Sequence, residues 1–195
     1  FATSGVMAGI RKKMDIFGVI VMAVMTAVGG GIIRDLVLGI HPPNTFKDPI
    51  YVEYSVATAV ILFVIFYIRK QMLDSKAMFY YERIMILLDA IGLGAFTVIG
   101  VETAYEIGFV HHRFLLLFVG VITGVGGGMI RDMMAQQIPF ILVKQIYACA
   151  SLIGAGVCIW LMPYHKSASM ILGAVVVVII RILAATYRWD LPKID

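Results

Sequence analysis

Charged residues are scarce in this 195-residue chain, at 14%, whereas hydrophobic residues make up 61% and the mean hydropathy is +0.95. Soluble domains contain about one quarter charged residues and about one half apolar residues, so this composition excludes the ordinary soluble class. Long uncharged runs cover residues 16–33, 54–68, 114–130, 145–164 and 167–180. A helix of about 20 apolar residues spans a hydrocarbon layer about 30 Å thick. The composition predicts an integral, all-helical membrane protein that crosses the bilayer several times.

Cysteine is also scarce, and the motifs of common enzymes are missing from the sequence. Cys149 and Cys158 fall in one apolar run, which favours small apolar fillers over a disulfide or a metal site. The glycine-rich stretches lack the Gly-Lys-Ser/Thr ending of a phosphate loop, and no metalloprotease helix motif or nucleophile–base pair is recognisable. The net charge of +4 comes from residues between the apolar runs. We therefore expect no enzyme, no metal site, no cofactor and no nucleic-acid partner.

Breakers and charges between the apolar runs divide the chain into seven predicted transmembrane helices. These helices lie at about 1–10, 16–39, 50–68, 84–102, 113–135, 141–162 and 167–187, and residues 188–195 form a tail. The chain opens with Phe1 inside an apolar stretch, so we expect the first helix to be truncated. A cleavable signal peptide is the alternative, but its charged region should come first, and here Arg11–Lys13 come last.

Basic residues are divided unevenly between the two sets of linkers that alternate along this order. Ten lie on one side and three on the other. The first set is Arg11, Lys12, Lys13, Arg69, Lys70, Lys76, Arg83, Lys144, Arg188 and Lys193, and the second is Lys47, Arg113 and Lys166. Because lysine and arginine accumulate in cytoplasmic linkers, we expect a cytoplasmic C-terminus and an N-terminus outside.

One ten-residue sequence occurs twice, as TAVGGGIIRD at Thr26–Asp35 and as TGVGGGMIRD at Thr123–Asp132, with eight identical positions. Three predicted helices separate corresponding points of the two copies. Three is an odd number, so the second copy must enter the membrane from the opposite side. The spacing predicts two inverted three-helix repeats, at 1–70 and 83–162, and an additional seventh helix at 167–187.

Three successive glycines within a predicted span allow two interpretations. Each glycine costs about 1 kcal/mol relative to alanine inside a helix, so the triplets require a reason. In the first interpretation, the small residues let neighbouring helices approach closely. In the second, they kink or unwind the helix and expose carbonyl oxygens to a water-filled path. The residues concerned are Gly29, Gly30 and Gly31 in the first copy, and Gly126, Gly127 and Gly128 in the second.

An arginine, Arg34 or Arg131, follows each triplet near or within the apolar zone. A charge at such a position is costly and usually faces the bundle interior or a water-filled path. On helical spacing the arginine shares one face with a threonine, Thr26 or Thr123, and with the middle glycine. Since the repeats are inverted, the two stripes are expected to meet near the midplane. This arrangement favours a permeation or transport pathway over a purely structural scaffold.

Asp35 and Asp132 follow the two arginines directly, and they point about 100° away from them on a helix. Each aspartate could therefore pair with an arginine on another helix. Asp89 lies in the fourth predicted helix and allows three interpretations. It is a charge at a helix end, a cation-attracting group at a pore mouth, or a partner for an arginine. Arg181, late in the last span, is interpreted as a residue that snorkels to the cytoplasmic side.

The duplicated Gly-Gly-Gly-x-x-Arg-Asp motif, in two three-helix repeats with a seventh helix, resembles the prokaryotic branch of the trimeric intracellular cation (TRIC) channel family. The resemblance covers nearly the whole chain. It implies a homotrimer in a bacterial or archaeal plasma membrane, with a pore in each subunit that conducts K⁺ and less selectively Na⁺. It also implies that the second and fifth helices are kinked at their glycines. No Lys-Glu-Val motif is present, so the lipid regulation of eukaryotic members is not expected here.

Two functions follow from these residues. In a passive channel for monovalent cations, the glycines expose backbone oxygens, and the arginine–aspartate pairs set the electrostatics and the gate. An unpaired arginine raises the barrier for a cation, so this function needs either neutralisation by the aspartates or a gating role. The alternative is a carrier for glycine, in which Arg34 and Arg131 bind the substrate carboxylate bidentately. Some bacterial relatives within the family are thought to move glycine.

Overall fold

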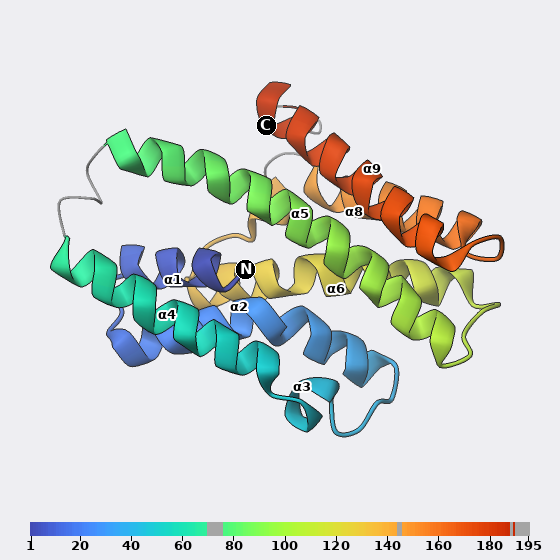
Figure 1. Cartoon of the computed structure of the whole chain (residues 1–195), viewed down its shortest axis with the longest axis horizontal. Coiled ribbons are helices and arrows are strands. Elements are labelled where there is room, and N and C mark those ends of the chain that lie inside the picture. Colours follow the sequence, from blue (N-terminus) through green and yellow to red (C-terminus); the bar gives the residue numbers. More distant parts are fainter. Residues whose placement is uncertain (70–75, 144–145, 188, 190–195) are drawn as a thin grey trace.

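The computed structural model describes residues 1–69, 76–143, 146–187 and 189, and this part of the chain is helical with turns and loops (Figure 1). The helices are α1 (Ala2–Arg11), α2 (Ile16–Val37), α3 (Asn44–Lys47), α4 (Ile50–Ile68), α5 (Lys76–Glu106), α6 (Arg113–Met134), α7 (Phe140–Val143), α8 (Tyr147–Leu161) and α9 (Lys166–Tyr187). The all-helical class predicted from the composition is confirmed. Apart from Trp189, the predicted tail at 188–195 lies outside the described residues.

Two helix boundaries differ clearly from those predicted. The helix expected at 84–102 is α5, which starts at Lys76 and ends at Glu106, because no glycine or proline in the flanking residues stops it. The helix expected at 141–162 consists of two elements, the short α7 and the longer α8. The single turn of α3, in the linker after α2, is not predicted by the apolar pattern.

Five helical segments are long and apolar enough to cross a membrane among the described residues. They are α2, α4, α6, α9 and the Ile84–Glu106 part of α5. Helix α8 is apolar but has 15 residues, and α1 has 10. The chain is therefore a multi-span helical membrane protein, while the count of seven spans stays a prediction.

Helices α2 and α6, which carry the duplicated motif, end in the same kind of turn. After α2, the Ile40 amide donates a hydrogen bond to the Asp35 carbonyl oxygen at 2.8 Å, and Gly39 has φ +72°. After α6, the Gln137 amide donates to the Asp132 carbonyl oxygen at 2.9 Å, and Gln136 has φ +52°. A left-handed residue enclosed by such a bond is the Schellman turn. Each helix thus ends two residues after its arginine–aspartate pair.

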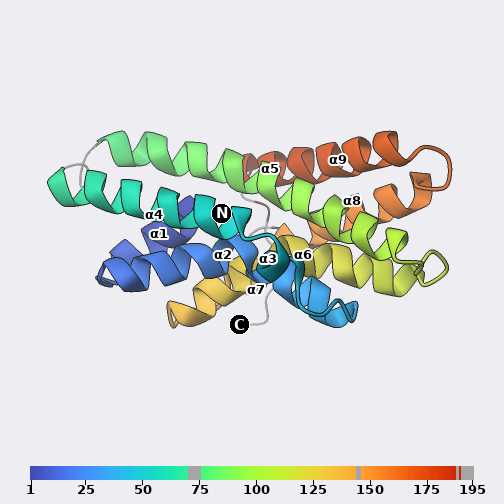
Figure 2. The ribbon, with the colours of Figure 1, turned by 60° about the horizontal axis from the view of Figure 1, so that its bottom comes forward.

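Helices α2 and α6 cross at the centre of the molecule and run in opposite directions (Figures 1 and 2). Helices α1 and α4 pack on α2, whereas α5 and α8 pack on α6, and α9 packs on α5 and α8. The core of the first group is formed by Val6, Val19, Ala23 and Ala59. A core of the second group is formed by Leu93, Val125, Tyr147, Ala150 and Val177. The orientation of the two groups relative to a bilayer stays a prediction.

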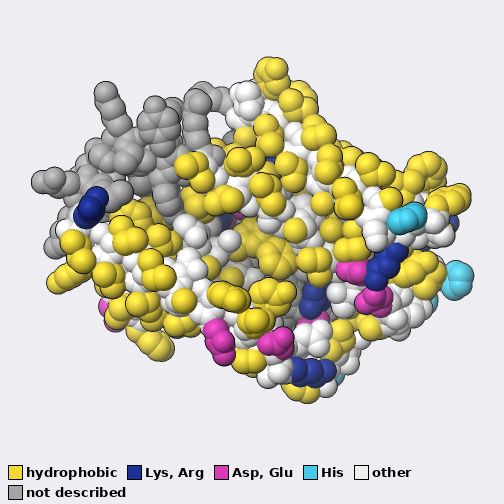
Figure 3. Space-filling model, in the orientation of Figure 1, with side chains coloured by type: hydrophobic (Ala, Val, Ile, Leu, Met, Phe, Trp, Pro, Cys, Tyr) yellow, Lys and Arg dark blue, Asp and Glu magenta, His cyan; other side chains and the backbone are white. Residues whose placement is uncertain are grey.

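The surface is rich in exposed apolar side chains. Figure 3 shows them covering most of the viewed face, with the charged side chains mainly towards its edges. On α9, Ile171, Val175 and Ile179 are 63%, 44% and 50% exposed and recur every four residues. Such a continuous apolar stripe is unfavourable in water and is solvated by the hydrocarbon of a bilayer.

Candidate functional site

The middle glycine of each triplet lies at the crossing of α2 and α6. A Cβ atom added to Gly30 would overlap the carbonyl oxygen of Thr123, and one added to Gly127 would overlap that of Thr26. A Cβ added to Gly126 would lie 3.1 Å from the Cα of Gly30. The middle glycine of each copy thus faces the threonine of the other copy, and such a reciprocal contact is typical of a two-fold arrangement. Close approach of the two helix backbones, the first of the two interpretations, is therefore what the middle glycines provide.

The remaining glycines of the triplets are less tightly enclosed. A Cβ added to Gly29 would meet the end of the Ile130 side chain. For Gly31 and Gly128, the nearest atom is an arginine Nη2 at 3.9 Å, which is an ordinary contact distance. Both helices stay helical through all three positions, so the unwinding weighed for the triplets is not found. The kink, and the lining of a pathway by these glycines, stay predictions.

The two threonines that begin the duplicated motif are buried in equivalent surroundings. Each hydroxyl donates a hydrogen bond of 2.6 Å to the carbonyl oxygen four residues earlier in its own helix. A Cβ added to Gly5 would lie 2.7 Å from Oγ1 of Thr26, and one added to Gly100 would lie 2.6 Å from Oγ1 of Thr123. The threonines thus pack against glycines of α1 and α5, which are the equivalent neighbours in the two groups of helices.

Each arginine of the motif pairs with the aspartate that follows it. Nε and Nη2 of Arg34 both lie 2.8 Å from Oδ1 of Asp35, and the same two atoms of Arg131 lie 2.8 Å from Oδ1 of Asp132. The sequence allowed a pairing of each aspartate with an arginine on another helix, and the structure shows each aspartate holding the arginine beside it in its own helix. The guanidinium folds back beside the third glycine of its own triplet, and from there it reaches the adjacent carboxylate. The two opposite charges therefore compensate each other locally.

The two pairs connect to different neighbouring elements. Oδ2 of Asp35 accepts a hydrogen bond from the Asn44 amide at the start of α3, at 2.7 Å. Nη1 of Arg131 donates to the Ser4 hydroxyl on α1. Both arginines lie in the last turn of their helices, where a cation interacts favourably with the helix dipole. Since the helices are antiparallel, the arginines lie on opposite sides of the crossing, and the glycines and threonines meet between them.

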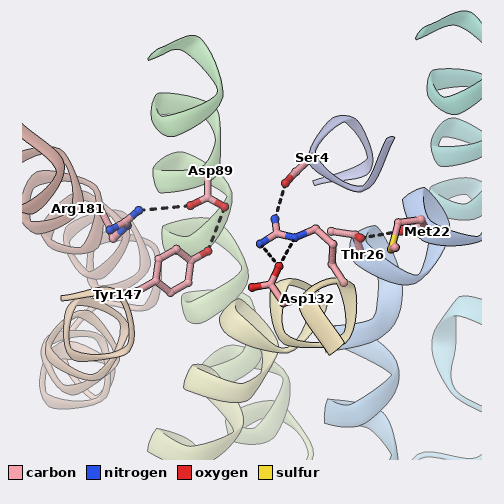
Figure 4. Close-up of polar contacts among 8 residues, drawn as sticks. Ser4, Met22, Thr26, Asp89, Asp132, Tyr147 and Arg181 are labelled. Atoms are coloured by element: carbon pink, nitrogen blue, oxygen red, sulfur yellow. Dashed lines mark hydrogen bonds and ion pairs between the residues drawn. The ribbon is translucent and has the colours of Figure 1, made fainter. Parts of the chain in front are cut away.

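Asp89 faces residues of two other helices in the bundle (Figure 4). Its Oδ1 accepts a hydrogen bond from the Tyr147 hydroxyl at 3.1 Å, and its Oδ2 lies 3.6 Å from Nη2 of Arg181. The Arg181 side chain is 2% exposed. The interpretation of Arg181 as a snorkelling residue is wrong, because its acidic partner lies inside the bundle. Of the three interpretations of Asp89, the structure shows the partner for an arginine.

Sequence reasoning did not find Ser4, Tyr147 or Arg181 as members of these polar groups. The signal for Arg181 was present, because it is the single charged residue in 167–187. The argument that places Arg34 inside the bundle applies equally to it. Ser4 and Tyr147 carry no such signal, since small polar residues within spans and tyrosines near span ends are common in membrane proteins.

Comparison with known proteins gives one family and several close relatives. The family model described as Glycine transporter matches residues 1–67 and 86–163. The UPF0126 inner membrane protein YadS of Escherichia coli (strain K12) is 39% identical over 200 residues, covering 98% of this chain and 89% of the relative. A UPF0126 membrane protein of Vibrio cholerae is 37% identical over 194 residues, covering 98% of this chain and 77% of the relative.

Solved structures of TRIC channels have the same fold as this chain. One, from work on conductance through TRIC cation channels, has a TM-score of 0.87 at 34% identity and covers 100% of this chain and 92% of the other. The TRIC trimeric intracellular cation channel orthologue from Rhodobacter sphaeroides has a TM-score of 0.83 at 31% identity, and the match covers 95% of this chain and 91% of the other. The similarity thus extends over nearly the full length of both chains in each comparison.

Proposed function

We infer the function from the family: this chain belongs to the TRIC-like family of membrane proteins whose model is described as Glycine transporter. The resemblance to TRIC channels is confirmed. We propose that the protein conducts monovalent cations, K⁺ or Na⁺, passively through a pore within each subunit. The observation that supports this most is the fold, which the chain shares over almost its whole length with structures of cation channels.

The compensated arginines support the same proposal. A bare guanidinium beside a pathway would repel a permeant cation. Here Arg34 and Arg131 each hold an aspartate oxygen at 2.8 Å, so each pair carries no net charge. Each pair also lies in the last turn of its helix, at one side of the α2–α6 crossing. We propose that Arg34/Asp35 and Arg131/Asp132 set the electrostatics of the two ends of a pathway between these helices.

The assembly in the membrane is part of the proposal. We propose seven spans, in two inverted repeats and a seventh helix, with the C-terminus in the cytoplasm of a bacterial or archaeal cell. The reciprocal contact of Gly30 and Gly127 supports the two-fold relation of the repeats. A homotrimer is proposed because a structure that this chain resembles is described as a trimeric channel.

A glycine carrier is the second candidate, favoured by the description of the family model. In a carrier, the arginines would bind the carboxylate of the substrate. One of the two edges by which each guanidinium can bind a carboxylate bidentately, Nε with Nη2, is occupied by the adjacent aspartate. A substrate carboxylate that used this edge would have to displace Asp35 or Asp132, and this competition makes the channel the better-supported function.

The deciding experiment reconstitutes the purified protein in planar bilayers and liposomes, under a KCl gradient, with uptake of labelled glycine measured in parallel. We expect unitary currents that reverse near the K⁺ equilibrium potential, and no saturable glycine uptake. Saturable uptake without unitary currents would instead establish the carrier.

A paired substitution separates the two functions further. Arg34→Ala alone would leave buried Asp35 without its partner, which typically costs about 3–5 kcal/mol. The double variant Arg34→Gln/Asp35→Asn keeps the local net charge and similar side-chain volumes. A channel should still pass current, with changed selectivity or opening, whereas a carrier should lose glycine uptake. Arg113→Gln, at an exposed arginine at the start of α6, is the matched control. If the double variant behaves like wild type in both assays, Arg34 and Asp35 contribute neither to conduction nor to glycine uptake.

A further inference from the structure

A second group of charged and aromatic side chains lies inside the bundle, on helices other than the two that carry the duplicated motif. It consists of Asp89 on α5, Tyr147 at the start of α8 and Arg181 on α9, and Figure 4 shows the three side chains pointing toward one another. Among the described residues, Arg181 has the largest side chain that is fully buried. A buried arginine within an apolar helix is costly, so the residues that surround it indicate what this site is suited to hold.

The surroundings of the guanidinium are those of a cation site. The Asp89 carboxylate supplies a negative charge, with Oδ2 3.6 Å from Nη2 of Arg181. The ring of Tyr147 supplies a π face, with its centroid 4.4 Å from Cζ of Arg181. A cation within about 6 Å of an aromatic centroid is attracted by the ring. The Tyr147 hydroxyl also donates to Oδ1 of Asp89 at 3.1 Å, which holds the carboxylate at the hydroxyl end of the ring.

The contact between Asp89 and Arg181 is looser than the pairs of the duplicated motif. Arg34 and Arg131 hold their aspartates at 2.8 Å with two nitrogens each, whereas 3.6 Å is beyond hydrogen-bond distance. The Asp89 side chain is 20% exposed, against 2% for Arg181. Asp89 and Tyr147 therefore attract Arg181 through charge and the aromatic face, and these two forces select for a cation without requiring the fork shape of a guanidinium.

We propose that Asp89 and Tyr147 form a binding site for a small monovalent cation, and that the guanidinium of Arg181 occupies this site as a tethered ligand. Arg181 thereby prevents Asp89 from attracting a free cation. This proposal concerns cation binding and does not depend on conduction. It can therefore fail while the channel proposal holds, and the channel proposal can fail while this one holds.

The test removes the tethered cation and offers free ones. The full chain is purified in detergent as wild type, Arg181→Ala, Arg181→Ala/Asp89→Asn and, as the matched control, Arg113→Ala. The melting temperature Tm is then measured at constant ionic strength in guanidinium, K⁺, Na⁺ or the bulky N-methylglucamine cation. Guanidinium is kept at low millimolar concentrations, far below those that denature proteins.

We expect Arg181→Ala to lose about 5 °C or more in N-methylglucamine, since a change of a few kcal/mol corresponds to such a shift in a chain of this size. Guanidinium should recover at least half of that loss, and K⁺ or Na⁺ a smaller part. Wild type and Arg113→Ala should not respond, because the first has its site occupied and the second retains Arg181. The double variant should not respond either, because it lacks the carboxylate.

Equal responses to all cations in Arg181→Ala, or the same guanidinium response in the double variant, would overturn the proposal. If Arg181→Ala is not recovered folded, Arg181→Lys takes its place. The shorter lysine keeps one charge but reaches the ring and the carboxylate less well, so guanidinium should still raise its Tm, at higher concentration. An Arg181→Lys protein whose Tm is the same in guanidinium and N-methylglucamine would overturn the proposal as well.

Discussion

At the scale of single residues, the glycines of a triplet have different tasks although the sequence repeats them alike. Gly30 and Gly127 face a main-chain carbonyl oxygen of the opposite helix, and a backbone atom cannot move aside as a side chain can. Gly31 and Gly128 have only an arginine Nη2 within 4 Å of an added Cβ, at 3.9 Å. The crossing of α2 and α6 therefore depends on the middle glycine and not on the third.

Alanine substitutions should reveal this difference. We expect Gly30→Ala to destabilise the protein by at least about 1–3 kcal/mol, because the new methyl group overlaps the Thr123 carbonyl oxygen. Gly31→Ala should be neutral or stabilising by up to about 1 kcal/mol, because alanine is the better helix former. Thermal unfolding in detergent measures both, and similar losses in the two variants would contradict the contact. A larger residue such as leucine at Gly30 would disrupt the packing of α2 against α6, so a loss of ion flux in such a variant would not test whether Gly30 lines a pathway.

At the scale of elements, α2 and α6 end in matching Schellman turns, but with different residues in the left-handed position. Gly39 holds φ +72° after α2, and Gln136 holds φ +52° after α6. Glycine adopts this conformation without steric cost, whereas other L-residues lose about 1–2 kcal/mol there. The two helix ends that carry the arginine–aspartate pairs are thus similar in geometry and unequal in strain.

This inequality predicts opposite effects of two substitutions. Gln136→Gly should raise the free energy of unfolding by up to about 1 kcal/mol, because it removes the strain of the left-handed backbone. Gly39→Ala should lower the free energy of unfolding by a similar amount, although an added Cβ meets no atom within 4 Å. Melting temperatures of the two variants and wild type provide the measurement. A loss of stability in Gln136→Gly would mean that the glutamine side chain contributes more than its backbone costs.

At the scale of the whole molecule, exposed basic residues lie in the linkers before and after α2. Lys12 and Lys13 precede the start of α2, whereas Lys47 lies in α3 beyond its end. Figure 1 shows that the chain enters α2 and leaves it at opposite ends of this helix, so the two linkers lie apart. If cytoplasmic linkers are the richer in lysine and arginine, the end with Lys12 and Lys13 faces the cytoplasm.

Accessibility of single cysteines should establish the orientation. Lys12→Cys and Lys47→Cys replace exposed residues at opposite ends of α2. We expect a membrane-impermeant thiol reagent to label Lys47→Cys in intact cells, and Lys12→Cys only after the membrane is permeabilised. The unsubstituted protein, with its partly buried Cys149 and buried Cys158, controls for background labelling. The reverse pattern would place the N-terminus in the cytoplasm.

The sequence by itself determined the class of the protein and the position of its central crossing. Scarce charge and long apolar runs require a bilayer as solvent, and such runs form helices because no water is present to bind free backbone groups. The duplicated ten-residue motif marked the two helices that cross, and it carried the resemblance to TRIC channels. These properties depend on composition and local pattern, which are explicit in the chain.

The tertiary structure decided which partner each of these residues has. Helical periodicity places Asp35 about 100° from Arg34, yet the long guanidinium folds back to reach it at 2.8 Å. The same periodicity could not show that Gly30 meets a carbonyl oxygen whereas Gly31 does not, because that depends on the axis and depth of the crossing. Arg181 points inward for a similar reason: Asp89 and Tyr147 come from two other helices, and only the packing of α5, α8 and α9 brings them together.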